Sequence, residues 1–180
     1  MISERKRDLL ARGLLQTTLT MEERLEAWNN DARSSAGELA HCQAAMILGR
    51  GPSLAGALQG ALLLKEVAKI PAEGMSSGEF SHGPLEAISR KISVVVLGGG
   101  RTSTLQYRLA LRSKALGASV LMLTPHRVKN VKSICFGKNT EILTIFPCTV
   151  LLELLAYHCA LRQRLNPDQL NFIQKVTTRE

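Results

Sequence analysis

Aromatic residues and long apolar runs are both scarce in this 180-residue sequence. Only 4% of the residues are aromatic although 45% are hydrophobic, so Ala, Leu, Ile and Val must form most of the core. This composition favours helices packed on a sheet. The longest uncharged apolar stretches, such as 92–97 and 147–152, fall far short of the roughly 20 residues that cross a bilayer. We therefore expect a globular protein without a membrane-spanning helix.

Cysteine is also sparse, and its spacing indicates neither a zinc site nor a disulfide framework. The four cysteines lie far apart and form no C-x-x-C pair; they are Cys42, Cys135, Cys148 and Cys159. Free cysteine is usually buried, so we predict that all four are small apolar core residues. No metal and no organic cofactor is expected. The N-terminus lacks the apolar segment of a signal peptide, so a cytoplasmic location is expected.

Acidic residues are outnumbered by basic ones. The 23 lysines and arginines exceed the 15 acidic residues by eight, which gives a net charge of +8 and a sequence pI of about 9.7. A field of this sign attracts nucleic acid, acidic lipid surfaces and phosphorylated small molecules alike. Neither a Walker A motif nor a G-x-G-x-x-G fingerprint is present, so nucleotide binding has little support. Charge alone leaves the choice among these anions open.

Helical and strand patterns alternate along the chain. The first forty residues are predicted to be helical, and Thr20 with Glu23 predicts a capping box before Met21. Strands are predicted at 44–48, 92–97 and 120–123, with weaker candidates at 134–136 and 142–146. Helices are predicted at 54–69, 103–116 and 151–164, and residues 74–83 form a predicted loop before a short helix at 84–89.

The clear strands are continuous apolar runs, which is typical of parallel strands covered on both faces. The fold class predicted is therefore α/β, a three-layer α/β/α sandwich with a mostly parallel five-stranded sheet. A helical N-terminal segment, 1–40, is predicted to precede the domain at 41–180.

Two glycine-containing loops follow predicted strands, at 49–53 and 98–104. In an open parallel sheet, ligands bind beyond the carboxyl ends of the strands, where helix N-termini present free N–H groups. The second loop carries Arg101, Thr102 and Ser103, which suit the binding of a phosphate. Glycine-rich turns between a strand and a helix are, however, often merely tight turns.

The segment from Gln59 to Ser89 is the most informative. It contains a helical Lys65-Glu66 pair and then the block Gly78-Glu79-Phe80-Ser81-His82-Gly83-Pro84. Here the chain resembles the sugar isomerase (SIS) domain family, in particular the second of the two SIS domains in glucosamine-6-phosphate synthases and related phosphosugar deaminases, deglycases and isomerases. The resemblance extends over roughly residues 25–180, and it implies the flavodoxin-like SIS fold.

The resemblance also implies roles for individual residues. Glu66 matches the carboxylate that moves a proton between C1 and C2 of an open-chain sugar, a step that needs a base above that bond. His82 matches the histidine that assists ring opening in the site of a neighbouring subunit. Lys175 matches a lysine that closes over the sugar, and Gln174 beside it is expected to contribute backbone contacts. No metal or organic cofactor is needed for this acid–base chemistry.

Three departures from the family pattern bear on function. Gln59 and Leu63 stand where the synthases carry charged residues, so synthase chemistry on fructose 6-phosphate is doubtful. The run of serines and threonines that holds phosphate in the first SIS domain is missing. Only one SIS domain is present where the family usually has two, and no catalytic cysteine follows Met1, so glutamine hydrolysis is not expected.

Two readings of function follow, together with a weaker third. The first is a phosphosugar isomerase, deaminase or deglycase that uses Glu66, His82 and Lys175. The second is a non-catalytic module that binds a phosphorylated sugar or assembles with another SIS chain. Under both, a homodimer or pairing with another SIS domain is expected. Nucleic-acid binding rests on charge alone and is not expected, because the first forty residues show no helix-turn-helix.

Overall fold

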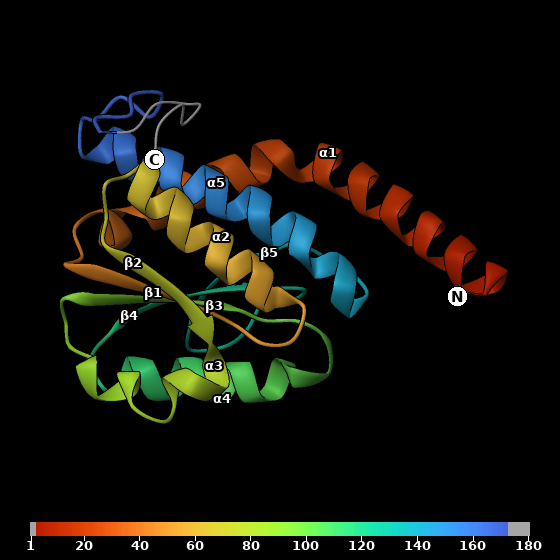
Figure 1. Cartoon of the computed structure of the whole chain (residues 1–180), viewed down its shortest axis with the longest axis horizontal. Helices are drawn as coiled ribbons and strands as arrows, with labels where there is room; N and C mark the ends of the chain where they lie inside the picture. The colour runs from red at the N-terminus through yellow and green to blue at the C-terminus, as the bar shows by residue number, and fades with distance from the viewer. Residues whose placement is uncertain (1–2, 173–180) are drawn as a thin grey trace.

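The centre of the molecule is a sheet of five strands, all parallel, as seen in the computed structural model, which describes residues 3–172 (Figure 1). The strands are β1 (Ala44–Gly49), β2 (Ala72–Ser76), β3 (Ile92–Leu97), β4 (Ser119–Thr124) and β5 (Lys132–Cys135). Their order across the sheet is β2-β1-β3-β4-β5. Five of the six residues of β3 are buried, as expected for a central strand covered on both faces.

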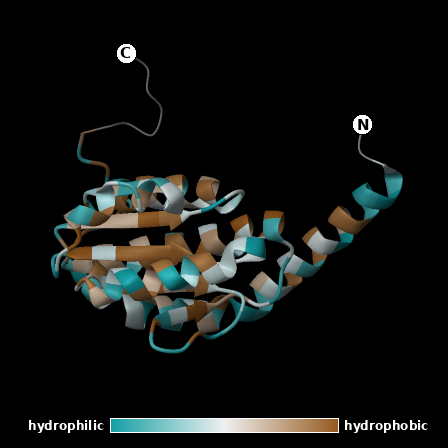
Figure 2. Ribbon diagram, turned by 90° about the horizontal axis from the view of Figure 1, so that it is seen from below, coloured by the Kyte–Doolittle hydropathy of each residue, from teal (hydrophilic) through white to brown (hydrophobic). Residues whose placement is uncertain are grey.

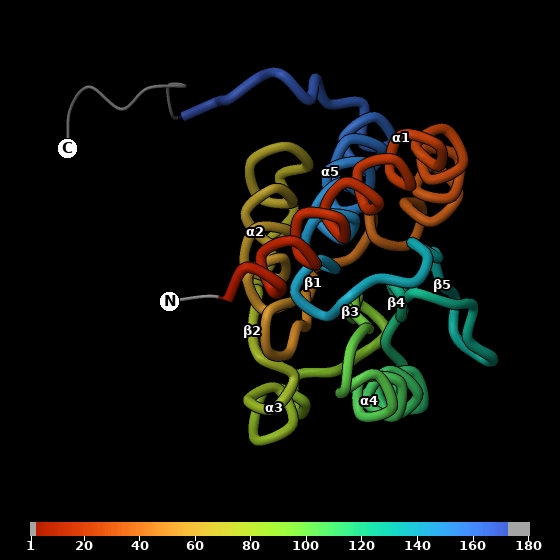
Figure 3. The backbone as a smooth tube through the Cα atoms, turned by 90° about the vertical axis from the view of Figure 1, so that its right-hand side faces the viewer, coloured from red at the N-terminus to blue at the C-terminus, as the bar shows by residue number. Residues whose placement is uncertain are grey.

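Helices cover both faces of this sheet (Figure 3). One face carries α1 (Glu4–Ala40), α2 (Ser53–Glu66) and α5 (Ile145–Arg162), and the other carries α3 (Ser77–Phe80) and α4 (Ser103–Ala115). Short 3-10 turns lie at η1 (Pro84–Ala87), η2 (Gly100–Thr102) and η3 (Glu141–Thr144). This arrangement confirms the predicted three-layer α/β sandwich.

The two halves of α1 have different environments. Its C-terminal half packs on α5 and places Trp28, Ala32 and Ala36 in the core. The Trp28 Nε1–H donates to the Cys135 carbonyl oxygen at 3.0 Å, which ties the helix to β5. The N-terminal half extends beyond the sandwich (Figures 1 and 2), and four of its five leucines are exposed. Half of α1 is therefore an integral part of the domain core.

One stretch, Glu141–Arg162, is long and apolar enough to cross a membrane by length and composition. More than half of its most apolar window is buried inside the domain, where α5 packs against α1 and α2. Leu151, Leu155 and Ala156 are fully buried there. Its apolar character is therefore explained by its place as the central helix of the α1–α2–α5 layer.

Besides the loop predicted at 74–83, three local predictions are wrong. Thr20 does not cap a helix, because α1 continues without a break from Glu4 and the Thr20 hydroxyl donates to the Gln16 carbonyl oxygen inside it. The strand expected at 142–146 is helical, since these residues form the end of η3 and the start of α5. Cys42 and Cys135 are only half-buried, whereas the other two cysteines are buried as predicted.

The sequence does not predict β2: no element is predicted at residues 72–73, and residues 74–76 fall in the predicted loop at 74–83. Its central residue is Gly74, and glycine is depleted in strands. A Cβ built on Gly74 would lie 2.5 Å from the Ala57 carbonyl oxygen of α2. The helix therefore approaches this strand so closely that a residue without a side chain is required.

Candidate functional site

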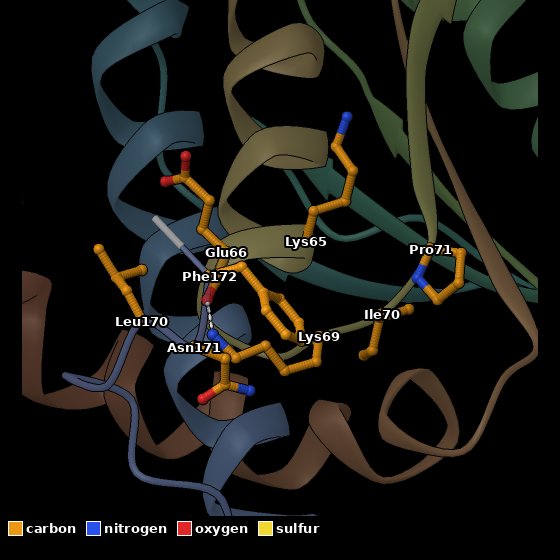
Figure 4. A pocket seen from close by; sticks show the side chains of 8 residues that line it. All are labelled: Lys65, Glu66, Lys69, Ile70, Pro71, Leu170, Asn171 and Phe172. Carbon is orange, nitrogen blue, oxygen red and sulfur yellow. Dashed lines mark hydrogen bonds between the residues drawn. The ribbon is translucent and has the colours of Figure 1, made fainter. Parts of the chain in front are cut away.

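A cleft of about 320 Å³ lies where α2 ends and β2 begins (Figure 4). Its lining residues come from the end of α2, the turn after it and the segment after α5; they are Lys65, Glu66, Lys69, Ile70, Pro71, Leu170, Asn171 and Phe172. The helix α2 starts at the carboxyl end of β1 and runs back along the sheet. This cleft therefore lies at the end of the sheet where the parallel strands begin. The predicted base Glu66 is therefore in a concave site.

The Glu66 side chain is half-buried in the last turn of α2. Its carboxylate points away from the Lys69 ammonium group (Figure 4). Within residues 3–172, no lysine or arginine forms an ion pair with Glu66, so its carboxylate is not held by a fixed cation there. A carboxylate with this freedom is able to accept a proton from a ligand in the cleft.

Lys69 shapes the floor of the cleft through both its backbone and its side chain. Its φ of 55° is in the left-handed region, which ends the helical run after α2 and is uncommon for a residue other than glycine. Its Nζ donates to the Glu66 carbonyl oxygen at 2.5 Å and to the Gln169 carbonyl oxygen at 3.0 Å. One side chain thus joins the end of α2 to the segment that follows α5.

The segment after α5 passes directly by Glu66. Leu170, Asn171 and Phe172 line the cleft, and Phe172 is the last residue that the structure describes. The predicted binding residues Gln174 and Lys175 lie outside the described residues. Their roles therefore stay predictions, and the last described position is two residues before Gln174 in the sequence.

The predicted ring-opening residue, His82, is not part of this cleft. It is exposed and follows α3, which begins directly after β2, whereas Glu66 precedes β2. Five strand residues at about 3.3 Å each separate the two ends of β2 by roughly 16 Å. Glu66 and His82 of one chain therefore lie at opposite ends of the strands, Glu66 where the strands begin and His82 where they end.

The predicted phosphate loop, 98–104, lies at the carboxyl ends of the strands, as His82 does. Arg101 is exposed, Thr102 is half-buried, and the Ser103 hydroxyl donates to the Gly100 carbonyl oxygen at 2.8 Å. Glu141 packs against this loop, because a Cβ built on Gly100 would lie 2.8 Å from Glu141 Oε1. A phosphate bound here would have to share the loop with a carboxylate.

Comparison with known proteins agrees with this architecture. The SIS domain family model matches residues 38–135, which is more than half of the chain. The chain belongs to the SIS domain family. It is 33% identical over 174 residues to a glutamine–fructose-6-phosphate aminotransferase (isomerizing) from Synechocystis sp., a match that covers 93% of this chain and 28% of that protein.

Two solved structures place this SIS domain among larger and similar-sized relatives. The C-terminal domain of glucosamine-fructose-6-phosphate aminotransferase from Francisella tularensis has a TM-score of 0.83 at 21% identity, covering 93% of this chain and 49% of that one. The structure of a protein from E. coli CFT073 has a TM-score of 0.71 at 14% identity, covering 92% of this chain and 95% of that one. The chain thus spans about half of the first structure and nearly all of the second.

The cleft beside Glu66 is also lined by residues that the sequence did not point to. Lys69, Asn171 and Phe172 contact the space beside Glu66. One feature of the sequence could have pointed to Lys69. In the segment Lys65-Glu66-Val67-Ala68-Lys69, the predicted base stands between two lysines that are four residues apart. Nothing in the local pattern shows that residues 170–172, a hundred positions later, return to the same place.

Proposed function

We propose that this SIS domain contributes the base of a phosphosugar isomerase site, with or without loss of an amine from the sugar. Glu66 removes a proton from C2 of an open-chain aldose phosphate, which yields an enediol, and returns the proton to C1 to give the ketose. The observation that carries the proposal is the half-buried Glu66 carboxylate in a cleft that residues 170–172 also line.

The remaining groups act around this proton transfer. Gln174 and Lys175 are proposed to close over the sugar, since they follow the segment that lines the cleft. His82 is proposed to move a proton between the ring oxygen and the C1 hydroxyl in the site of a neighbouring subunit, as an imidazole is able to do near neutral pH. No metal or organic cofactor takes part in these steps.

Because Glu66 and His82 lie at opposite ends of the strands, the proposed site is shared between two domains. Arg101, Thr102 and Ser103 lie at the same end of the strands as His82. In this proposal they contact the phosphate of a sugar. The C1–C2 bond of that sugar faces Glu66 of a partner domain. The partner is a second copy of this chain or another SIS domain. If the partner is another SIS domain, it would also supply the phosphate-binding serines and threonines that this sequence lacks; a second copy of this chain would not.

The first test compares Glu66→Gln with the wild-type protein and with Glu22→Gln, which changes an exposed carboxylate on α1. Turnover and binding are measured on a panel of hexose phosphates and amino-sugar phosphates. Loss of a positioned base lowers the rate by about 10²–10⁴-fold, so we expect Glu66→Gln to lose turnover while thermal stabilisation by the sugar phosphate is kept. Glu22→Gln should behave as wild type.

Two outcomes would contradict the proposal. Unchanged turnover in Glu66→Gln would exclude Glu66 as the base. Stabilisation of the wild type by a sugar phosphate without turnover, in the presence of any SIS partner found with it, would favour the binding-module reading. Transfer of solvent deuterium into the C1 or C2 position of the product gives a direct signal of the proton-transfer step.

A further inference from the structure

A second cleft, of about 220 Å³, opens on the other face of the sheet between α3 and α4. Figure 3 shows these two helices next to each other on the face away from α2 and α5, and thus away from the Glu66 cleft. Its polar lining consists of three arginines and two serines, which we call the arginine cleft: Arg50, Arg108, Arg112, Ser77 and Ser81. None of its lining residues is acidic.

The arginines of this cleft have no partners among residues 3–172. The ion pairs in that part of the chain do not include them, and their guanidinium groups donate no hydrogen bond there. Arg108 and Arg112 lie one turn apart on the same side of α4, an arrangement of like charges that destabilises a helix. An anion between them would remove this repulsion. The nearby Glu79 does not supply it, because its carboxylate accepts from the Ser76 backbone N–H.

Ser77 is a buried serine in the lining of the same cleft. It is 3% exposed, and its hydroxyl has no hydrogen-bond partner within the described residues. Such a group costs about 1–3 kcal/mol when it is left unpaired. The neighbouring Ser81 hydroxyl is satisfied, since it donates to the Ser77 carbonyl oxygen at 3.0 Å. Ser77 is therefore the one lining hydroxyl that still lacks an acceptor or donor.

From these contacts we infer that the arginine cleft binds the phosphate group of a small phosphorylated metabolite. Guanidinium groups match the oxygens of a phosphate with paired hydrogen bonds. The volume suits a phosphate group and a few further atoms, and it is below the usual range for drug-sized ligands. Exposed Leu105 and buried Leu109 provide an apolar wall for the carbon part of such a molecule. This site is separate from the Glu66 cleft and does not depend on catalysis there.

The test measures binding of inorganic phosphate and of glucose 6-phosphate by isothermal titration at constant ionic strength and pH 7.5. The variant is Arg108→Gln with Arg112→Gln, and its matched control is Arg24→Gln with Arg127→Gln, which removes the same charge from exposed positions elsewhere. Charge-assisted hydrogen bonds are strong, so we expect the first pair to weaken binding at least about tenfold and the control pair to change it less than about twofold. Backbone amide shifts of Ser77 and Ser81 should move on titration of the wild type.

Several results would overturn this inference. Equal weakening by both double variants would indicate attraction by net charge only. Unchanged binding in the Arg108→Gln, Arg112→Gln variant would place the phosphate elsewhere. If that variant altered the sedimentation of the protein while phosphate binding stayed the same, the arginines would be contacts for an acidic segment of a second copy. Ser77 and Ser81 line the arginine cleft and not the Glu66 cleft, so their amide shifts on titration separate this site from the proposed base.

Discussion

His158 is a buried histidine whose ring is held by one specific contact. Its Nε2 lies 2.7 Å from Asn29 Oδ1, so the α5 side chain pairs with a polar group of α1. The side chain is 4% exposed. Burial lowers the pKa of His158, with a further lowering by the positive charges of Arg33 and Arg162 and an opposing effect of its contact with Asn29. The neutral imidazole is therefore the form that the folded protein prefers.

This lowered pKa makes stability depend on pH in a defined direction. Because the unfolded chain binds the proton more readily, the free energy of unfolding falls as the pH drops below about 6.5 and continues to fall to the lower pKa of the folded state. Chemical denaturation at pH 7.5 and pH 5.5 should show this loss in the wild type and a smaller loss in His158→Gln. The exposed His126→Gln is the control, and equal pH dependence in the wild type and His158→Gln would contradict the assignment.

The cysteines show how far single residues are predictable. Cys148 and Cys159 are buried as expected, and burial raises the pKa of each thiol to about 12. The same expectation applies to Cys42 and Cys135, but Cys42 follows the end of α1, Cys135 ends β5, and both are only half-buried. Residue type predicts an average burial, whereas the position in an element decides the individual case.

At the scale of elements, the contact of β2 with α2 sets the position of the Glu66 cleft. Gly74 lies in β2, and its missing side chain allows the backbone of α2 to approach. Since Glu66 ends the same helix, a change in this spacing moves the proposed base relative to β2. A glycine that looked like a loop residue in the sequence is thus a packing residue of the sheet.

Gly74→Ala is expected to destabilise the protein. Its Cβ would lie 2.5 Å from the Ala57 carbonyl oxygen and 2.7 Å from Leu58 Cα, and backbone atoms cannot rotate away. Overpacking of this kind costs about 1–3 kcal/mol. The control is Gly37→Ala in α1, where the new Cβ meets only the end of Arg162 at 3.7 Å; there alanine should stabilise the helix by up to about 1 kcal/mol. Denaturant midpoints distinguish the two, and equal shifts would refute the packing argument.

The elements that were predicted correctly are those whose structure follows from the local sequence pattern. The strands β1, β3 and β4 are continuous apolar runs, and α4 ends before Gly117, so local pattern and tertiary packing agree. The failures occur where tertiary contacts decide. Gly74 is tolerated in a strand because of α2, and residues 142–146 become helical because they continue into the buried α5. The cleft partners of Glu66 were hidden for the same reason, since they meet it only through the fold.

For the whole molecule, the exposed half of α1 and the separation of Glu66 from His82 both point to assembly. Leu9, Leu15 and Leu19 are between 50% and 63% exposed on a helix that extends beyond the sandwich (Figure 1). A projecting helix with apolar positions suits contact with another chain. The chain also covers only 28% of its Synechocystis relative and 49% of the Francisella structure. We therefore propose that an active unit contains at least two SIS domains.

A subunit-mixing experiment tests whether the proposed site is shared. In a homodimer whose sites each combine Glu66 of one chain with His82 of the other, Glu66→Gln and His82→Asn are each inactive alone. Mixed at equal amounts and allowed to exchange, they form hybrid dimers in which one site carries both changes and the other carries neither, so about a quarter of the wild-type activity returns. If Glu66 and His82 of one chain served one site, every mixture would stay inactive. A wild-type protein that sediments as a monomer while turning over substrate would exclude the shared site altogether.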